Sequence, residues 1–528
     1  MAKYIFVTGG VVSSLGKGIV AASIGVLLKS RGLKVTMQKF DPYINVDPGL
    51  MSPLQHGEVF VTKDGAETDL DLGHYERFID ENLTKYSSVS SGRVYKAVID
   101  NERQGKYLGK TVQVIPHITD EIKRLLKRAA ANTKADVVIV EVGGTVGDIE
   151  SLPFLEAIRQ TRREFGEENT FYIHATLVPY LKAAGELKTK PTQHSVKELK
   201  SLGIQPDMLV LRSEEPIEQE HIEKISLFTD INTEAIFQSY DVPIVYEIIL
   251  NLQKQKIDDL ILNHFKIRNL KPANLSRWEQ LIQQIKQTKN EVKIAIIGKY
   301  VSLHDAYISL IESLKHAGWN QNKLINIIWI DSEKTTKETL VKQLDEVDGI
   351  LIPGGFGQRG IDGKMWALEY GRTNLVPTLG ICFGMQLAAI EFAKNVLKLN
   401  GVCSDEFDEC GNNVIRKNYS NRFKLGEYAT QFKEGSKISE IYGANQTRER
   451  HRHRFEFNHK YVKDFEDNGM LVTGFNRRIK AVDVLELKNH PWYIHVQYHP
   501  EYISRPLKPH PLFIDFVKAC AKNQKDKN

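Results

Sequence analysis

The chain has 528 residues, which is too long for one hydrophobic core, so two or three domains are expected. Its 41% hydrophobic and 26% charged residues are ordinary for a globular protein, and a net charge of +5 over this length gives no general case for binding nucleic acid. No apolar run approaches the about 20 residues that a membrane span requires, and four scattered cysteines predict neither a disulfide framework nor a metal-ligand set. We therefore expect a cytoplasmic protein without nucleic-acid or membrane partners.

Short β-branched runs in the first half of the chain alternate with helical patterns. The runs cover residues 4–7, 35–39 and 137–142, and the helical patterns cover 23–30 and 118–131. Strands that alternate with helices predict a parallel sheet with helices on both faces. The same rhythm begins again at 293–298, so the sequence predicts two α/β units.

A glycine-rich segment, GGVVSSLGKG at residues 9–18, follows the first predicted strand and opens a helix. Consecutive backbone N–H groups at a helix N-terminus bind anions, and Lys17 adds a positive charge. The segment is not a regular Walker A motif, because the spacing from Gly10 to Gly16 is one residue too long and Gly18 replaces the hydroxyl residue that would bind magnesium. A glycine-rich turn with an exposed lysine is the alternative.

The missing hydroxyl leaves carboxylates as the candidate metal ligands. Asp69, Asp71 and Glu141 are the candidates, and Glu141 ends the apolar run 137–140 where ligands bind in open α/β sheets. Magnesium prefers one or two carboxylates together with phosphate oxygens.

A linker, predicted at residues 266–291, separates the two halves. Ser276 and Glu279 have the spacing of a capping box, and an apolar stripe follows at helical spacing: Trp278, Leu281, Ile282 and Ile285. We therefore expect a docked helix and not a flexible tether.

Cys382 lies between two glycines in Gly380-Ile381-Cys382-Phe383-Gly384, after an apolar run and before a helix-forming stretch. This is the pattern of a nucleophile elbow with cysteine in place of serine, and a helix N-terminus favours the thiolate. A buried, inert thiol is the other interpretation. The distant His499-Pro500-Glu501 favours the elbow, because a thiolate that attacks an amide needs an acid–base partner and that partner needs an orienting group.

The second half resembles the class I (triad) glutamine amidotransferases, which have the same elbow and the same His-Pro-Glu. The resemblance implies that glutamine is hydrolysed through a thioester on Cys382, with His499 as base and then acid and Glu501 orienting it. Residues 353–357 resemble the family's oxyanion loop, with the Gly355 N–H opposite that of Phe383. The positions that match the family's glutamine contacts are Gly355, Phe383, Gly384, Met385, Gln386, Glu406 and Arg454.

A dense basic run, Arg-Glu-Arg-His-Arg-His-Arg, occupies residues 448–454. It is compatible with phosphate binding, and a solvated charged face is the simpler interpretation.

Five further segments, residues 4–19, 41–48, 55–61, 143–158 and 188–197, resemble the CTP synthase family, so the resemblance covers nearly the whole chain. It implies two doubly wound, mostly parallel α/β domains: a P-loop-like synthetase domain related to dethiobiotin synthetase at 1–265 and an amidotransferase domain at 292–528, joined by the helix at 266–291. It also implies a carbon–nitrogen ligase of pyrimidine biosynthesis, which phosphorylates the 4-oxygen of UTP with ATP and displaces it with ammonia.

The same resemblance implies the nucleotide contacts. ATP would be held by Ser14, Leu15, Gly16, Lys17, Gly18, Ile19, Asp71 and Val242. UTP or the product CTP would contact Ser13, Asp148, Ile149, Glu150, Lys188, Thr189, Lys190, Pro191, Thr192, Gln193 and Lys224. Asp71 and Glu141 would bind the Mg²⁺ that accompanies ATP.

Regulation and assembly also follow from the resemblance. It implies GTP as an allosteric activator, CTP as a feedback inhibitor, and a homotetramer (a dimer of dimers) able to form filaments. Lys424 stands where the family usually has an arginine in a loop implicated in GTP activation, so we expect a weakened GTP response.

Two other functions compete with this interpretation. One is a different ATP-dependent amidotransferase that amidates a carboxylate on a larger metabolite; the Lys-Thr-Lys-Pro-Thr-Gln-His segment at 188–194 argues against it. The other is a non-catalytic scaffold, which the presence of Lys17, Cys382 and His499 argues against.

Overall fold

The structure is a computed structural model that describes residues 2–12, 15–183, 185–407, 412–418, 423–476 and 481–527. The chain forms two compact units, the first from Met1–Leu50 and Asp71–Ile282, the second from Met51–Leu70 and Gln283–Asn528. The predicted limits at 265 and 291 stay predictions. Residues 51–70 pack with the second unit, although the residues before and after them belong to the first. The sequence patterns did not indicate this.

The first unit is built on a seven-stranded sheet in the order β11-β10-β7-β1-β6-β2-β5, and every neighbouring pair is parallel. Its strands are β1 (Lys3–Gly9), β2 (Val35–Asp41), β5 (Ser88–Ser90), β6 (Val137–Val142), β7 (Thr170–Leu177), β10 (Met208–Ser213) and β11 (Ile236–Tyr240). The strands predicted at 4–7, 35–39 and 137–142 therefore form neighbouring strands at its centre.

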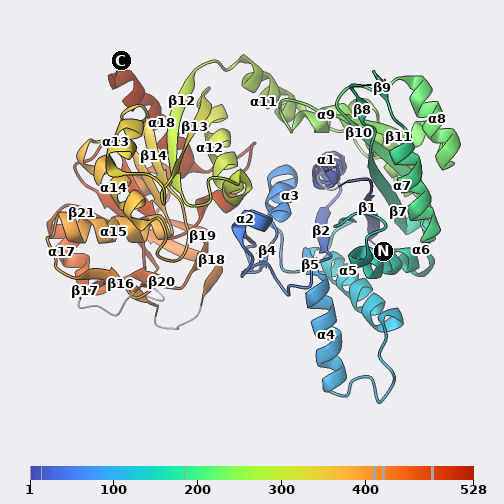
Figure 1. Cartoon of the computed structure of the whole chain (residues 1–528), viewed down its shortest axis with the longest axis horizontal. Coiled ribbons are helices and arrows are strands. Elements are labelled where there is room, and N and C mark those ends of the chain that lie inside the picture. Colours follow the sequence, from blue (N-terminus) through green and yellow to red (C-terminus); the bar gives the residue numbers. More distant parts are fainter. Residues whose placement is uncertain are drawn as a thin grey trace. The chain divides into compact units, whose positions relative to one another are not determined.

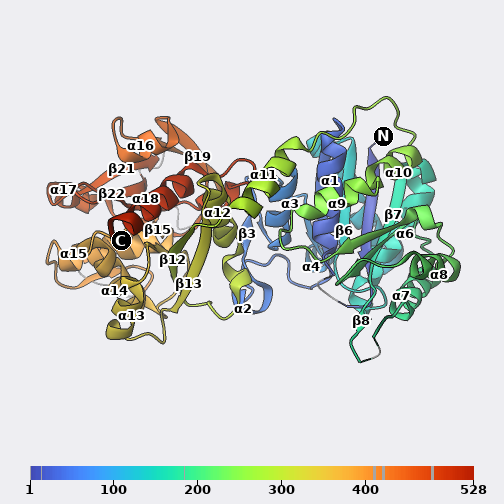
Figure 2. The same cartoon turned by 90° about the horizontal axis from the view of Figure 1, so that it is seen from above.

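Helices cover both faces of this sheet, as Figures 1 and 2 show. One layer contains α1 (Lys17–Ser30), α3 (Asp71–Ile79), α9 (Glu247–Lys254) and α10 (Ile257–His264). The other contains α4 (Ser91–Arg103), α5 (Thr119–Thr133), α6 (Leu152–Phe165) and α7 (Lys190–Ser201), with α8 (Gln219–Thr229) beside α7. Helix α5 forms because Ile122, Leu125, Leu126 and Ala129 recur at helical spacing, and this stripe packs on the aromatic side chains of the sheet.

The second unit is built on a nine-stranded sheet in the order β13-β12-β14-β15-β23-β22-β21-β18-β19. The five strands from β13 to β23 are parallel, and the remaining pairs are antiparallel. The parallel strands are β12 (Glu291–Gly298), β13 (Leu324–Asp331), β14 (Gly349–Ile352), β15 (Thr378–Ile381) and β23 (Tyr493–Val496). The others are β18 (Lys424–Phe432), β19 (Gln446–His453), β21 (Met470–Asn476) and β22 (Ala481–Leu487).

Two hydrophobic clusters flank this sheet. Helices α13 (Lys337–Asp345), α14 (Ile361–Thr373), α15 (Phe383–Asn395) and α17 (Val462–Asp467) contribute to one, and α12 (Ile308–Asn320), α16 (Lys437–Tyr442) and α18 (Pro511–Lys527) contribute to the other. A small sheet of β16 (Val402–Ser404), β17 (Asn412–Lys417) and β20 (Phe455–Phe457) lies at one side. No helix among the described residues is both long and apolar enough to cross a membrane.

The segment 51–70 forms the short helix α2 (Pro53–His56) and a hairpin of β3 (Phe60–Val61) and β4 (Glu67–Thr68). Tyr502 donates its hydroxyl to the Val59 carbonyl at 3.1 Å, and Arg450 donates to the Val61 carbonyl at 2.9 Å. Arg452 pairs with Glu67 at 2.8 Å. The basic run 448–454 is therefore neither a solvated face nor an open phosphate site, because its fully buried Arg450 and mostly buried Arg452 hold this hairpin.

The predicted linker helix is α11 (Ser276–Gln287), and all four residues of its predicted stripe are buried. Trp278 packs on Tyr246 and Phe78 within the first unit. The cap differs from the prediction: the side-chain oxygen of Asn274 accepts the Ser276 N–H at 3.2 Å. Asn274, two residues before Ser276, therefore provides the side-chain acceptor at the start of the helix. The capping box that the Ser276–Glu279 spacing predicted is not the cap of this helix.

Candidate active sites

Cys382 occupies a sharp turn between β15 and α15. Its φ of 53° and ψ of −104° are rare for a residue with a side chain, so the turn is strained, as a nucleophile elbow requires. A β-carbon on Gly384 would lie 2.3 Å from the Ile352 carbonyl oxygen, and one on Gly380 would lie 2.9 Å from the backbone of Gly384. The flanking glycines are therefore needed because the turn packs directly on neighbouring backbone.

His499 follows β23, the strand that pairs with β15, and its Nδ1 lies 2.7 Å from Glu501 Oε1. Burial alone would lower the pKa of His499, but the Glu501 carboxylate and the Cys382 thiol raise that pKa to about 10. Its Nε2 has no hydrogen-bond partner in the described part of the chain, so this nitrogen is left to exchange a proton with the thiol or a substrate.

Cys382 and His499 meet at Gly354. A β-carbon on Gly354 would lie 3.0 Å from His499 Cε1 and 3.6 Å from Cys382 Cβ. The Cys382 thiol donates to the Arg452 carbonyl at 3.6 Å and accepts from the Gln497 amide at 3.7 Å. The structure thus brings together the three predicted catalytic residues, whose roles are taken up under the proposed function.

The predicted oxyanion loop at 353–357 is held from two sides. Lys299 donates to the Phe356 carbonyl, and the Gly357 N–H donates to Glu406 Oε1 at 2.7 Å. Burial raises the pKa of Glu406, although the Gly357 N–H and Lys299 oppose this shift. Glu406, predicted to contact glutamine, therefore also fixes the loop.

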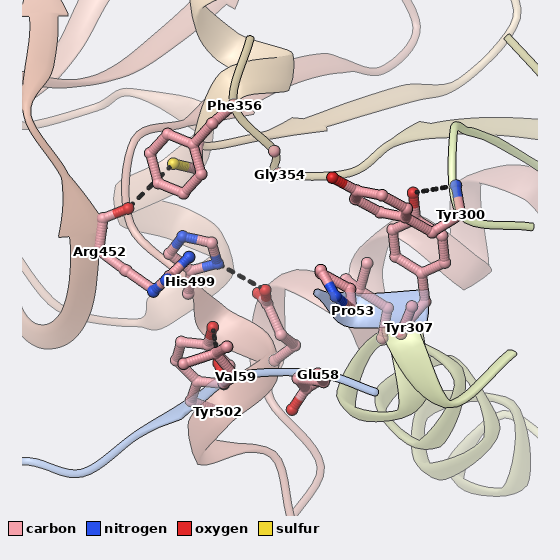
Figure 3. A pocket seen from close by; sticks show the side chains of 15 residues that line it. Pro53, Glu58, Val59, Tyr300, Tyr307, Gly354, Phe356, Arg452, His499 and Tyr502 are labelled. Carbon is pink, nitrogen blue, oxygen red and sulfur yellow. Dashed lines mark hydrogen bonds and ion pairs between the residues drawn. The ribbon is translucent and has the colours of Figure 1, made fainter. Parts of the chain in front are cut away.

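A cavity of about 110 Å³ opens onto Cys382, His499 and Glu501, and Figure 3 shows the side chains around it. The oxyanion loop, the aromatic rings of Tyr300, Tyr307 and Tyr502, and the segment 51–70 complete its wall. From that segment come Pro53, Glu58 and Val59, and Glu58 accepts the Ser309 N–H at 2.8 Å at the start of α12. The sequence did not indicate these contributions.

The remaining predicted glutamine contacts lie around the elbow. Phe383, Gly384, Met385 and Gln386 form the first turn of α15 and are buried. Gln386 donates to the Phe455 carbonyl at 3.0 Å and to Gln497 at 3.3 Å, so its side chain supports the residue that contacts the Cys382 sulfur. The Arg454 guanidinium lies over the Phe423 ring, 4.5 Å from its centroid.

In the first unit the predicted phosphate loop leads into α1, whose first residue is Lys17. Gly16 adopts the left-handed conformation with φ 77°, and Lys17 donates to the Gly144 carbonyl at the end of β6. Burial lowers the pKa of Lys17, while Glu141 and Asp71 oppose this shift. Ser13 and Ser14, predicted contacts of UTP and ATP, lie outside the described residues.

The two predicted metal carboxylates converge beside this loop. Lys39 of β2 forms ion pairs with both Asp71 and Glu141, the latter at 2.9 Å, and Tyr75 donates to Glu141. A β-carbon on Gly18 would lie 2.9 Å from Glu141 and 3.6 Å from Asp71, so the absence of a side chain at Gly18 leaves room for the carboxylates. The candidate Asp69 belongs to the second unit.

Lys39 is a functional candidate that the sequence reasoning missed. Burial lowers its pKa, but Asp71 and Glu141 together raise that pKa well above the usual value, so the side chain is a buried cation between two carboxylates. A lysine near the end of a buried strand, in Lys39-Phe40-Asp41, was the available signal. No cluster of three or more His, Cys, Asp or Glu side chains suited to a metal occurs within the described ranges.

The predicted UTP segment lies at the start of α7. Three of its side chains are buried: Thr189, Thr192 and Gln193. The two lysines are more exposed. Lys188 pairs with Glu186, and the Lys190 ammonium lies 5.7 Å from the Phe228 ring centroid. Pro191 is the second residue of α7, and Lys224 is exposed on α8.

The other predicted nucleotide contacts lie in two loops. Asp148, Ile149 and Glu150 are exposed just after β6, and Asp148 is close enough to Lys17 to affect its pKa. Val242 follows Asp241, which pairs with Arg212 at 3.1 Å, and Arg212 approaches Gly16. Leu15 and Ile19 flank Gly16, Lys17 and Gly18 at the start of α1.

Lys424, where the family usually has an arginine, lies inside the second unit, and the expected weak GTP response stays a prediction. Its side chain is buried, pairs with Asp483 at 3.3 Å and lies over the Tyr428 ring. A lysine that neutralises a buried carboxylate is not free to bind a nucleotide. The sequence showed a cation in a polar loop, and its partner lies on a strand about 60 residues away, which local patterns do not reveal.

Cys382 and Cys520 are free thiols, whereas Cys403 is disulfide-bonded, which the spacing of the cysteines did not predict. Cys410 lies outside the described residues.

A cysteine–histidine–glutamate triad on an elbow defines the second unit as a triad glutamine amidotransferase, here joined to a unit with a lysine at the start of α1 and two paired carboxylates. The family model described as CTP synthase N-terminus matches residues 3–267, and the one described as Glutamine amidotransferase class-I matches 302–519.

Curated relatives match along the whole chain. CTP synthase of Onion yellows phytoplasma is 59% identical over 532 residues, covering 99% of this chain and 98% of that protein. CTP synthase of Listeria monocytogenes is 57% identical and that of Geobacillus kaustophilus 55% identical, each covering 99% of this chain and 100% of the relative. Among solved structures, the acivicin-bound glutaminase domain of Trypanosoma brucei CTPS is 33% identical, with a TM-score of 0.42, over 44% of this chain and 94% of that one. The chain belongs to the CTP synthase family.

Lys364 of α14 is a second residue that the sequence reasoning did not single out. Its side chain is fully buried, its Nζ lies 5.2 Å from the Phe383 ring centroid, and this nitrogen has no hydrogen-bond partner within the described ranges. Burial and the nearby Lys299 lower its pKa to about 7, and only Cys382 opposes the shift. An unpaired buried ammonium destabilises the fold.

We predict that Lys364→Met raises the melting temperature at pH 7 by about 4 °C or more, because Met fills the space without a charge. The destabilisation by Lys364 is fully present below pH 7 and fades as the pH rises toward 10.5, where the unfolded lysine also loses its proton. The gain should therefore be smaller at pH 9.5 than at pH 7. Thermal unfolding of the variant and the wild type at both pH values measures this. An unchanged or lower melting temperature for Lys364→Met at pH 7 would contradict the prediction.

Proposed function

We propose that the protein converts UTP into CTP with ATP as phosphoryl donor, using ammonia released from glutamine or taken from solution. The observation that carries this proposal is the presence, in one chain that matches the CTP synthase family along its length, of the Cys382–His499–Glu501 triad and of the Lys17–Asp71–Glu141 cluster. A non-catalytic scaffold accounts for neither set of residues, and the Lys-Thr-Lys-Pro-Thr-Gln-His segment at 188–194 argues against an amidotransferase that acts on a carboxylate.

The triad suits hydrolysis of the glutamine amide. The Cys382 thiolate attacks the amide carbon, the N–H groups of Gly355 and Phe383 stabilise the oxyanion, and His499 protonates the departing ammonia. A thioester remains, and water activated by His499 hydrolyses it to glutamate. Glu501 orients the imidazole and stabilises its charged form, which agrees with the raised pKa of His499.

The first unit suits phosphorylation of UTP. The uracil 4-oxygen attacks the γ-phosphorus of ATP and ADP leaves; ammonia then adds to C4, and phosphate departs with loss of a proton. Lys17 and the N–H groups of the loop at 9–18 would hold the ATP phosphates, and Thr189, Thr192 and the adjacent lysines of α7 would hold UTP.

Asp71 and Glu141 fit Mg²⁺ as two convergent carboxylates that already surround a cation, the Lys39 ammonium. When bound, the ion supplies positive charge that neutralises the phosphate oxygens. The chain's own contribution is to bring both carboxylates together beside Lys39 and to leave room for them at Gly18.

Ammonia released at Cys382 would pass internally to the UTP site, because free ammonia is mostly protonated at neutral pH. An internal route keeps ammonia from being protonated in solution.

Regulation, assembly and location complete the proposal. GTP would activate the glutamine-dependent reaction, CTP would inhibit by competing with UTP, and the enzyme would act in the cytoplasm as a homotetramer, a dimer of dimers able to form filaments. These features rest on membership of the family and not on contacts described above.

The decisive assay is the ultraviolet absorbance change when the purified protein is mixed with UTP, ATP, Mg²⁺ and ammonia. CTP formation supports the proposal, and absence of CTP with both ammonia and glutamine would refute it.

We predict that Cys382→Ala lowers glutamine-dependent CTP formation by about 10³-fold or more while ammonia-dependent formation stays near wild type, because only the former needs the thioester. Equal loss with both nitrogen donors would contradict the separation into two sites.

We predict that Lys17→Ala lowers CTP formation from both nitrogen donors by about 10²-fold or more, because phosphorylation of UTP precedes either one. Glutamine hydrolysis by the free enzyme should continue, which controls for folding of the second unit. Normal ammonia-dependent turnover in this variant would remove Lys17 from the phosphate site.

We predict that Glu150→Ala raises the inhibition constant of CTP more than it raises the KM for UTP, because the two nucleotides share a triphosphate and differ at the base. Inhibition by CTP in the ammonia-dependent assay measures the difference. A parallel change in both constants would mean that residues 148–150 serve the structure alone.

A further inference from the structure

A buried hydrogen-bonded chain links the strand that enters the phosphate loop to the helix that would hold UTP. Thr8 lies near the end of β1, His174 lies opposite it on β7, and Ser195 lies on α7. The Thr8 hydroxyl is 2.9 Å from His174 Nδ1, and the Ser195 hydroxyl is 2.8 Å from His174 Nε2. All three side chains are buried, and that of His174 is completely so.

The direction of these hydrogen bonds follows from the number of protons available. The Thr8 hydroxyl also donates to the Ile173 carbonyl at 3.2 Å, and a carbonyl can only accept. Because a hydroxyl has one proton, Thr8 must accept from the Nδ1–H of His174. The Nε2 of a neutral ring is then an acceptor, and Ser195 donates to it.

His174 is suited to hold this arrangement over a wide pH range. Complete burial and the charge of Lys17 lower its pKa to about 3, so the imidazole stays neutral, with one donor and one acceptor. Neither a protonated ring, with two donors, nor an apolar side chain could satisfy both hydroxyls in this way.

The glycine loop packs directly on this chain. A β-carbon on Gly10 would lie 1.7 Å from Ser195 Oγ and 3.3 Å from His174 Nε2, so the backbone of the loop rests on the serine and the ring. A second link lies one turn earlier on α7, where the Thr192 hydroxyl is 2.9 Å from that of Thr176 and donates to the Leu177 carbonyl at 3.1 Å. The position of α7 is thereby tied to β7 and to the loop together.

We propose that His174 is a positioning residue that fixes the phosphate loop and α7 relative to each other, so that the γ-phosphoryl group of one nucleoside triphosphate meets the acceptor oxygen of the other. This inference rests on the proposed function, which places the two nucleotides at these two elements. Phosphoryl transfer depends on alignment of the reacting atoms, and a misplacement of about 1 Å lowers the rate by about 10²-fold. His174 itself touches neither nucleotide.

The test is ammonia-dependent CTP formation by His174→Leu in the full-length protein. We expect kcat to fall by about 10²-fold, while the Kd of ATP and the Kd of UTP, each measured alone, change by less than about threefold. The matched control is His495→Leu, because His495 is also fully buried, has a pKa lowered to about 3 by burial, and has no hydrogen-bond partner in the described part of the chain. This control should keep the ammonia-dependent kcat of the wild type.

A second measurement decides the matter if His174→Leu does not fold. Thr8→Val and Ser195→Ala each release one end of the ring, so each should lower kcat by about tenfold, and the double variant should lose little more than either single variant. Additive losses would overturn the proposal, as would a wild-type kcat in His174→Leu or a loss confined to nucleotide affinity. Failure of the wild-type protein to form CTP would instead refute the proposed function, which distinguishes the two results.

Discussion

Parallel pairing of strands at the centre of both sheets is the constraint on which both sites depend. In a parallel sheet the carboxyl ends of neighbouring strands lie at one edge, so residues far apart in sequence meet there. Gly380 on β15 lies opposite His495 on β23, and the chain then delivers Cys382 and His499 to the same edge. In the other sheet Glu141 lies opposite both Val7 and Lys39, which brings the candidate metal carboxylate, the start of the predicted phosphate loop and the buried lysine together.

The two sites differ in how they accommodate buried charge. Lys39 is compensated by two carboxylates, which raise its pKa well above the usual value although burial lowers it. Lys364 has no such partner among the residues that the structure describes, and its lowered pKa reflects the cost of that isolation. His499 lies between these cases, since burial disfavours its charge while Glu501 restores it. A charged site is therefore stable here only where the opposite charge is supplied by the fold or by a substrate.

Features that depend on adjacent residues could be predicted from the sequence. The elbow around Cys382, the strands β1, β2 and β6, and the stripe of α11 are local patterns, and the structure has each of them. Lys39 was missed because a lysine within a strand resembles any edge residue until the partner strand places Glu141 beside it. The burial of Lys424 was missed for the same reason, since Asp483 becomes its partner only through the packing of the second sheet. The roles of the predicted site residues remain predictions.

Because residues 51–70 belong to the second unit, the two units cannot be separated by cutting the chain once. The chain passes between the two units after residues 50, 70 and 282, so no single cut releases either unit whole. A fragment that begins at the linker would lack the hairpin that covers Arg450 and the Glu58 carboxylate that caps α12. Its glutaminase pocket would also be missing one wall. The second unit expressed without residues 51–70 would therefore be incomplete, and the design of a free glutaminase would have to attach this hairpin to it again.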